Sequence, residues 1–165
     1  MNAAVRRRIR SIRALVLDVD GVLTDGSLYY GPAGQAFKRF DVQDGMGIRL
    51  VQESGLVVAF LSAEETEIVR RRARKLKVRH VFLGVDDKLR ALDRFLSAQR
   101  LPYASAAYVG DDVNDLPPLR RVGLAVAVAN AVPAVRRAAH WVTSHRGGEG
   151  AVREVCDALL TGKRV

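Results

Sequence analysis

The chain has few sulfur-containing and aromatic side chains, since its 165 residues include one Cys, two Met and one Trp. The single cysteine, Cys156, cannot form an internal disulfide, which favours a reducing cytoplasm. Apolar runs stay below the about 18 residues that a membrane-spanning helix needs, and the sequence does not open on a secretory signal pattern. We therefore expect a cytoplasmic protein without membrane partners. At 48% hydrophobic residues, one globular domain over residues 1–165 could bury a core.

Acidic residues are also scarce, because 18 Asp and Glu face 27 Lys and Arg, giving a net charge of +9. Such an excess is compatible with nucleic-acid binding, and basic residues cluster between positions 70 and 79. Apolar residues at helical spacing lie in the same segment, however, and indicate an amphipathic helix with a solvated cationic face. No zinc-ligand spacing, aromatic RNA-binding platform or helix-turn-helix pattern accompanies it. We expect no specific nucleic-acid binding, and attraction for small anions explains the charge equally well.

Short apolar segments alternate with amphipathic ones along the chain. They predict strands over residues 14–19, 56–62, 80–83, 106–110, 124–128 and 141–143, and helices over residues 47–53, 65–76, 88–99, 115–122, 133–138 and 150–160. This alternation is typical of a three-layer, Rossmann-like α/β fold with a mostly parallel central sheet and helices on both faces. Residues 26–41 interrupt the rhythm with a Gly-Pro-Ala-Gly turn and predict a β-hairpin insertion. It is too short to form a cap domain.

Two aspartates directly follow the first predicted strand, in the sequence Asp18-Val19-Asp20-Gly21. Strand side chains alternate, so residues i and i+2 project the same way. Asp18 and Asp20 can therefore converge at the edge where open α/β sheets bind ligands. Burying acids there costs several kcal/mol unless a cation or hydrogen bonds compensate. Asp18 and Asp20 therefore predict a catalytic or ligand-binding site rather than a structural role in the core.

Three further groups end or follow predicted strands. Ser62 could bind a phosphate oxygen together with backbone N–H groups at a helix start, although serine is also a common helix cap. Lys88 opens a helix and would, taken alone, be a surface lysine. Asp111, Asp112 and Asp115 form a carboxylate-rich turn suited to a hard divalent cation, and helix capping accounts for only one of them. Because each group follows a strand, all are predicted to meet along one sheet edge.

In this order the motifs resemble the capless subclass of the haloacid dehalogenase-like phosphotransferases. The resemblance rests on Asp18-x-Asp20-Gly21, Ser62, Lys88 and Gly110-Asp111-Asp112-x-x-Asp115. Residues 17–26, 44–48 and 147–154 are more specifically similar to the 3-deoxy-D-manno-octulosonate (KDO) 8-phosphate phosphatase group, which includes nine-carbon ulosonate (KDN) 9-phosphate phosphatases. The similarity extends over about residues 12–160.

The resemblance implies a phosphomonoesterase that removes the terminal phosphate of a 2-keto-3-deoxy sugar acid phosphate through an aspartyl-phosphate. Asp18 would be the nucleophile, and Asp20 would be the general acid and then the general base. Ser62 and Lys88 would bind the transferring phosphoryl oxygens.

The resemblance also implies a Mg²⁺ ion held by Asp18, the backbone carbonyl of Asp20, and Asp111. Either Asp112 or Asp115 would orient Lys88 or a water molecule.

Within the first motif, Gly21 and Thr24 are expected to contact substrate.

The family resemblance further implies a homotetramer in which the hairpin of one subunit, about residues 26–41, shields the active site of its neighbour. Tyr29, Tyr30, Phe37 and Phe40 fit such an interface, though a hairpin packed on its own core would need them too. The C-terminal segment, about residues 145–165, is expected to help close the site.

One departure from the octulosonate phosphatases bears on substrate, because Ser62-Ala63-Glu64 stands where they usually carry Thr-Gly-Arg. The absent arginine removes a partner for the substrate carboxylate, and Glu64 with Lys75 is more similar to the nine-carbon phosphatases. Eleven helical residues span about 16 Å, so Lys75 could reach substrate only in a neighbour's site. It could equally be a solvated surface lysine.

Two other functions remain open at this point. Another capless phosphatase could act on a nucleic-acid end or a phosphoprotein, because a fold does not fix its substrate. A non-catalytic binding protein is the second alternative, and the intact set of aspartates argues against it.

Overall fold

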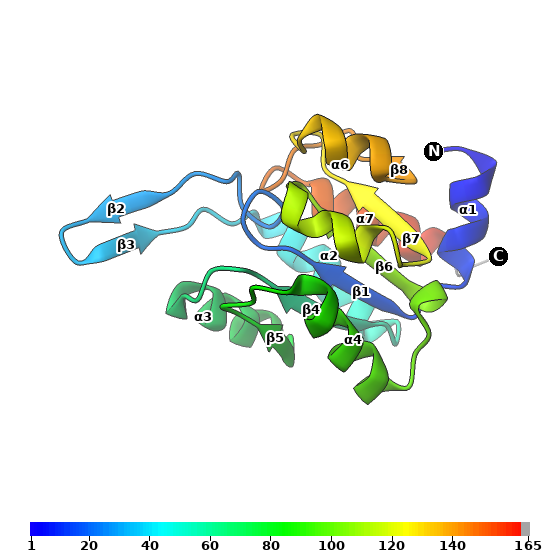
Figure 1. The fold of residues 1–165 in the computed structure, drawn as a ribbon, viewed down its shortest axis with the longest axis horizontal. Helices are drawn as coiled ribbons and strands as arrows, with labels where there is room; N and C mark the ends of the chain where they lie inside the picture. Colours follow the sequence, from blue (N-terminus) through cyan, green and yellow to red (C-terminus); the bar gives the residue numbers. More distant parts are fainter. Residues whose placement is uncertain (163–165) are drawn as a thin grey trace.

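The computed structural model describes residues 1–162, which build an α/β fold around a six-stranded sheet (Figure 1). The strand order is β5-β4-β1-β6-β7-β8, and every neighbouring pair is parallel. The strands are β1 (Ala14–Leu17), β4 (Val57–Leu61), β5 (His80–Phe82), β6 (Ala106–Gly110), β7 (Leu124–Ala127) and β8 (Trp141–Val142). The predicted fold class is confirmed.

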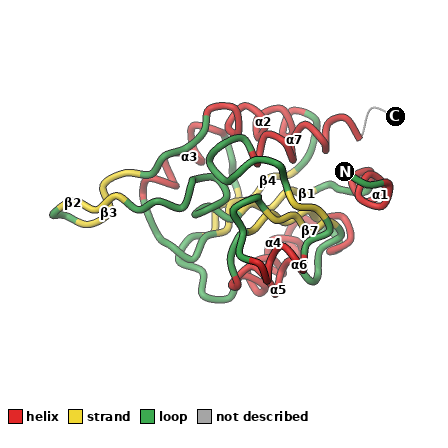
Figure 2. The backbone as a smooth tube through the Cα atoms, turned by 90° about the horizontal axis from the view of Figure 1, so that it is seen from above, coloured by secondary structure: helices red, strands yellow, loops and turns green. Residues whose placement is uncertain are grey.

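Helices cover both faces of the sheet (Figure 2). One face carries α2 (Val42–Glu53), α3 (Glu67–Leu76) and α7 (Ala151–Gly162), and the other carries α4 (Lys88–Gln99), α5 (Leu116–Leu119) and α6 (Pro133–Ala138). Two short 3-10 helices, η1 (Tyr103–Ser105) and η2 (Val113–Asp115), flank β6. Because both faces are covered, β1, β6 and β7 consist entirely of buried residues.

The chain order places the end of β1 at the middle of the sheet edge. From β1 the chain continues to β4 and β5 on one side, then crosses to β6, β7 and β8 on the other. Such a reversal opens a crevice at the carboxyl ends of the strands, where α/β proteins bind ligands. Asp18 and Asp111 directly follow β1 and β6.

Two segments differ from the helices expected from sequence. Helix α2 begins at Val42 rather than at 47, because Asp41 caps it by accepting hydrogen bonds from the N–H groups of Gln43 and Asp44. The segment expected to form one helix over 115–122 instead forms the 3-10 helix η2 and then the short α5. Asp112 and Asp115 form a capping box, which starts the 3-10 helix at Val113, before the expected helix start.

The basic N-terminus forms an additional helix, α1 (Ala3–Arg10), which the sequence analysis did not predict. Val5 and Ile9 lie one helical turn apart and are buried, and α1 contacts α7 and β7. Val5 and Ile9 are the two large apolar residues of this arginine-rich helix, so the helical periodicity of apolar residues extends over only one turn.

The hairpin predicted after the first strand is present and projects away from the sheet (Figure 1). It consists of β2 (Tyr29–Gly31) and antiparallel β3 (Gly34–Phe37). Tyr30 and Phe37 are 69% and 70% exposed. The Arg39 guanidinium ties its base to the body, with Nη1 lying 3.2 Å from Asp25 Oδ2 and 3.7 Å from Glu149 Oε1.

The basic segment is the amphipathic helix α3, as expected. Its buried face carries Val69, Ala73 and Leu76. Among the described residues, arginines on its other face form ion pairs with Glu65 and Glu67.

No helix in residues 1–162 combines the length and apolar character needed to cross a membrane. Cys156 is buried in α7, and burial raises the pKa of its thiol well above its usual value.

A buried carboxylate joins α2 to the start of α7. Asp44 is 1% exposed, and its Oδ1 accepts a hydrogen bond of 2.7 Å from the Arg153 N–H. Its Oδ2 has no hydrogen-bond partner within residues 1–162. Burial raises the pKa of Asp44 to about 6, although the backbone bond to Arg153 opposes the shift. Residues 163–165 of the expected closing segment lie outside the described residues.

We predict that Asp44→Asn raises the free energy of unfolding at pH 8 by about 2 kcal/mol and has little effect at pH 4. The pKa of Asp44 is higher in the folded than in the unfolded state, so wild-type stability falls as pH rises from about 4 to 6. Asparagine keeps the acceptor for Arg153 without the charge. Urea denaturation at both pH values measures the effect, with exposed Asp86→Asn as control. A change of equal size at pH 4 and pH 8 would contradict this account.

Candidate active site

Asp18, Lys88 and Asp115 form a buried ion-pair chain at the carboxyl edge of the sheet. Asp18 follows β1, Lys88 is the first residue of α4, and Asp115 ends η2. Lys88 Nζ lies 2.9 Å from Asp18 Oδ1 and 2.6 Å from Asp115 Oδ1. All three residues are at least 95% buried. Lys88, which taken alone would be a surface lysine, therefore lies in the site where the family resemblance placed it.

Asp115 uses both carboxylate oxygens to hold its neighbours. Oδ1 accepts from Lys88 and from the Tyr108 hydroxyl at 2.7 Å, and Oδ2 accepts from the Asp111 N–H at 2.9 Å and the Asp112 N–H at 3.3 Å. Asp115 therefore orients Lys88. Tyr108 was not predicted, because a tyrosine in an apolar strand is typical of core packing.

Asp112, the other residue considered for that task, is exposed at the edge of the pocket that lies over this site, and within residues 1–162 no hydrogen bond joins it to Lys88. Its Oδ1 accepts a hydrogen bond from the Val113 N–H, which caps the 3-10 helix.

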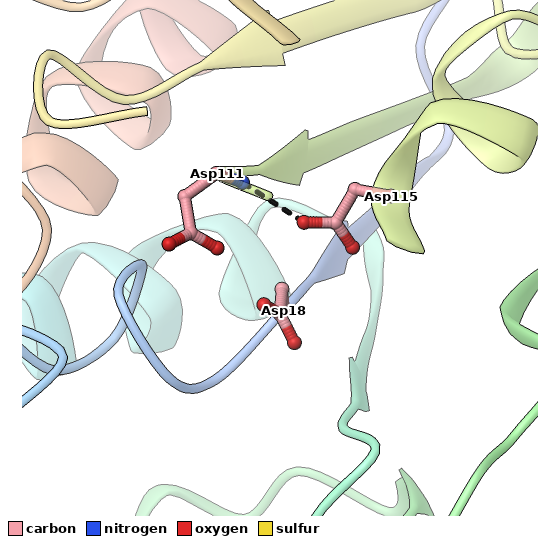
Figure 3. A group of neighbouring side chains, drawn as sticks. All are labelled: Asp18, Asp111 and Asp115. Atoms are coloured by element: carbon pink, nitrogen blue, oxygen red, sulfur yellow. Dashed lines mark hydrogen bonds between the residues drawn. The ribbon is translucent and has the colours of Figure 1, made fainter. Parts of the chain in front are cut away.

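Carboxylates outnumber ammonium groups at this edge. Asp18, Asp111 and Asp115 each place a carboxylate oxygen within 4.8 Å of the others (Figure 3). Among the described residues, the ammonium group of Lys88 pairs with two of these carboxylates, Asp18 and Asp115. Burial, reinforced by Asp115, raises the pKa of Asp18 well above its ordinary value and that of Asp111 to about 6. Burial lowers the pKa of Lys88, but Asp18 and Asp115 more than offset this and leave it raised. The site therefore favours an additional cation.

The donor set fits Mg²⁺. Both oxygens of Asp115 are occupied by protein donors, whereas Asp18 and Asp111 lie beside one another just beyond the carboxyl ends of the paired strands β1 and β6 (Figure 3). Carboxylate oxygens are the ligands that Mg²⁺ prefers. Asp18 and Asp111 would hold the ion, and the Asp20 carbonyl, the third predicted ligand, belongs to the loop after Asp18.

The loop after β1 depends on a glycine and a threonine. Gly21 has φ +83°, and a Cβ there would overlap Asp111 Oδ2, so only glycine lets the backbone approach that carboxylate. The buried Thr24 Oγ1 accepts hydrogen bonds of 3.2 Å from the Gly21 and Gly26 N–H groups. These contacts shape the loop. The substrate contacts expected of Gly21 and Thr24 stay predictions.

Asp20 lies beside Ser62, as expected, and also beside a lysine that sequence reasoning missed. Ser62 Oγ donates to Asp20 Oδ2 at 3.3 Å and accepts from the Glu64 N–H at 3.1 Å. Lys38, at the base of the hairpin, forms an ion pair with Asp20 Oδ1.

A second missed residue, Asn130, joins the catalytic loop to the C-terminal segment. Its Nδ2 donates to the Gly21 carbonyl at 3.0 Å, and its Oδ1 accepts from the Gly147 N–H at 2.7 Å. The Gly148 N–H donates to the Val22 carbonyl at 3.0 Å. A Cβ at Gly147 would overlap the Gly21 carbonyl, so the glycine permits this contact. The C-terminal segment therefore packs against the loop that carries the predicted catalytic aspartates.

An open pocket of about 270 Å³ lies over these groups, and Asp18, Asp20, Ser62, Lys88 and Asp111 line it. Glu64 lines the same pocket, as its proposed role in specificity requires. Lys75 is exposed on α3 and does not line this pocket. A larger pocket of about 480 Å³ lies at the opposite, amino-terminal ends of β4 and β5, and no predicted site residue lines it.

Comparison with known proteins agrees with this geometry. Residues 63–155 match a family model for haloacid dehalogenase-like hydrolases. A Yersinia pestis protein named 3-deoxy-D-manno-octulosonate 8-phosphate phosphatase is 43% identical over 94% of this chain and 83% of its own length.

A crystal structure of the phosphatase of that name from Yersinia pestis superposes with a TM-score of 0.98 at 41% identity, covering 99% of this chain and 89% of that one. The phosphatase of the same name from Moraxella catarrhalis, crystallised with magnesium, phosphate and KDO, has a TM-score of 0.95 at 35% identity, covering 97% and 92%. This chain belongs to the haloacid dehalogenase-like hydrolases.

The family model begins at residue 63, after the two aspartates of the first motif. The Yersinia pestis relative spans 156 aligned residues of this hydrolase, so the similarity is not confined to the half that the model matches.

We predict that Mg²⁺ raises the melting temperature of the metal-free hydrolase, and does so more at pH 7.5 than at pH 5. Protons compete with the ion for Asp18 and Asp111, whose pKa values are raised. At about 100 times the dissociation constant, the stabilisation is about 2.7 kcal/mol. Thermal denaturation with and without Mg²⁺ measures it.

Asp111→Asn should largely remove this shift, and the exposed Asp112→Asn should keep it. A shift that is the same at both pH values, or that survives Asp111→Asn, would show that the ion binds elsewhere.

Proposed function

We propose that this hydrolase is a Mg²⁺-dependent phosphatase that removes the terminal phosphate of KDO 8-phosphate or a close 2-keto-3-deoxy sugar acid phosphate. The observation that carries the proposal is the buried Asp18 paired with Lys88 and facing Asp111, in a chain 43% identical to a phosphatase named for that substrate. The single, buried cysteine supports a cytoplasmic location.

In the first half-reaction, Asp18 attacks phosphorus. Lys88 holds Asp18 Oδ1, which leaves Oδ2 to form the new bond while the bond from phosphorus to the sugar oxygen breaks. Asp20 donates a proton to that leaving oxygen. The sugar acid departs and an aspartyl-phosphate remains.

In the second half-reaction, water attacks the phosphorus of the aspartyl-phosphate and gives its proton to Asp20. The bond from phosphorus to Asp18 breaks, so inorganic phosphate is released and both aspartates return to their starting states. Lys88 and Ser62 line the pocket and bind the phosphoryl oxygens. Bound Mg²⁺ supplies charge neutralisation between the nucleophile and the phosphate.

Substrate choice rests on two observations that favour different sugars. Relatives named for the eight-carbon substrate favour KDO 8-phosphate. Glu64 lines the pocket where an arginine is usual, which favours a nine-carbon acid whose hydroxyl or amino groups can donate to it. We propose KDO 8-phosphate as the principal substrate because the similarity extends over 94% of the chain.

Phosphate release from matched eight-carbon and nine-carbon ulosonate phosphates tests this proposal. We expect turnover with Mg²⁺, loss of turnover with EDTA, and a higher kcat/KM for the eight-carbon substrate. Asp18→Asn should lower kcat by at least about 10³-fold, since it removes the nucleophile.

Preference for the nine-carbon substrate would keep the mechanism and assign specificity to Glu64. Failure to hydrolyse either substrate, with the fold intact, would refute the proposed substrate class.

We further propose that the chain assembles as a homotetramer in which the hairpin covers a neighbour's site. Tyr29, Tyr30 and Phe37 are exposed on a hairpin that projects from the body (Figure 1), and exposed apolar clusters mark interaction sites. Over residues 1–162, the pocket above Asp18 remains open to solvent and is lined by Gly26 at the start of the hairpin segment.

We predict that the double variant Tyr30→Lys, Phe37→Lys lowers the oligomeric mass, because two charges in an apolar interface oppose association. Sedimentation velocity measures the mass, and Ala98→Lys, on the exposed face of α4, is the matched control. A wild-type protein that sediments as a monomer at assay concentrations would refute the assembly.

A further inference from the structure

The lysine beside Asp20 is unusual for its position in the chain. Lys38 lies one residue beyond β3, at the base of an exposed hairpin, yet its side chain is 0% exposed. Its ammonium pairs with Asp20 Oδ1, and the Asp20 side chain is 26% exposed. Burying an ammonium costs several kcal/mol unless it is paired. The ion pair with Asp20 therefore compensates an otherwise unfavourable burial.

The two contacts of Asp20 differ in strength. Oδ1 is held by the buried ammonium of Lys38, and Oδ2 receives a long hydrogen bond of 3.3 Å from Ser62 Oγ. Both donors bond to a carboxylate, but Lys38 carries a full positive charge, whereas Ser62 makes a long bond through a neutral hydroxyl. Lys38 is thus the stronger restraint on the direction in which the carboxylate points.

We propose that Lys38 is a positioning residue for the acid–base step, holding Asp20 by Oδ1 so that Oδ2 faces the pocket beside Ser62. The inference rests on the proposed phosphatase function. It gives each aspartate its own lysine, because Lys88 holds Oδ1 of Asp18 in the same way.

The proton travels through Oδ2 of Asp20, the carboxylate oxygen that Lys38 does not hold. Asp20 enters the first half-reaction protonated on Oδ2 and gives that proton to the leaving sugar oxygen, which leaves a carboxylate; in the second half-reaction Oδ2 takes a proton back from the attacking water. Lys38 keeps its own protons throughout and stays at Oδ1. The carboxylate that Asp20 becomes on donating the proton forms with Lys38 the ion pair seen in the structure.

A purely structural role, as an anchor for the hairpin, is the competing explanation, and the neighbouring residue separates the two. Arg39 ties the same segment to Asp25 and Glu149 but does not contact Asp20. Arg39→Met therefore disturbs the anchor alone, whereas Lys38→Met disturbs both the anchor and Asp20.

The experiment is steady-state kinetics of the full-length variants with the sugar phosphate that wild type hydrolyses best. We expect Lys38→Met to lower kcat by about 10²-fold, the lower range for general acid–base catalysis, while KM changes by less than about threefold, since ground-state binding is kept. Arg39→Met should keep kcat within about threefold of wild type. Circular dichroism and melting temperature establish that each variant is folded.

Chemical rescue provides a second readout that an anchor would not give. In Lys38→Ala, added propylammonium can occupy the space of the missing side chain and restore part of kcat, without any effect on wild type or Arg39→Met. The inference is overturned if Lys38→Met keeps wild-type kcat, if Arg39→Met loses as much, or if amines do not rescue Lys38→Ala. An inactive wild type would instead refute the proposed function.

Discussion

The fourfold hydrogen bonding of the buried Asp115 carboxylate is the constraint on which the rest of the site depends. Asp115 accepts from Lys88, Tyr108 and the backbone N–H groups of Asp111 and Asp112. These bonds join three elements, β6, η2 and α4, to one acceptor. They fix the loop that carries Asp111 and place the Lys88 ammonium against Asp18. A buried carboxylate is tolerable here only because four donors satisfy it.

Charge balance explains why the site combines these particular residues. Lys88 is bonded to two carboxylates, so the group retains excess negative charge, and burial together with this charge raises the pKa values of Asp18 and Asp111. A divalent cation would remove that excess and let Asp18 act as an anion. Asp20 stands apart because it has a lysine of its own, Lys38. The two aspartates of one motif therefore contact different lysines, which supports the different roles proposed for them.

The sequence predicts those parts of the site that are local. Asp18 and Asp20 follow an apolar strand, and Ser62, Lys88 and Asp111 each come at a recognisable strand end or helix start. Contacts between distant segments could not be predicted in this way. Lys38 lies 18 residues from Asp20 and Asn130 lies 109 from Gly21.

A lysine in a hairpin is normally solvated, and no local pattern indicates that the Lys38 ammonium turns inward. The start of α2 was predicted too late for a different reason. Asp41 is a typical helix N-cap that marks this start, whereas the periodicity of apolar residues does not. Adjacent residues of one short segment also have opposite surroundings, since Phe37 is 70% exposed and the Lys38 side chain is fully buried. Backbone geometry links the two, so a displacement of β3 also moves the ammonium that holds Asp20. If a neighbouring subunit fixes the exposed face of the hairpin, as proposed, it would also fix the carboxylate proposed to carry the proton, so that assembly and acid–base chemistry would be coupled through one peptide unit.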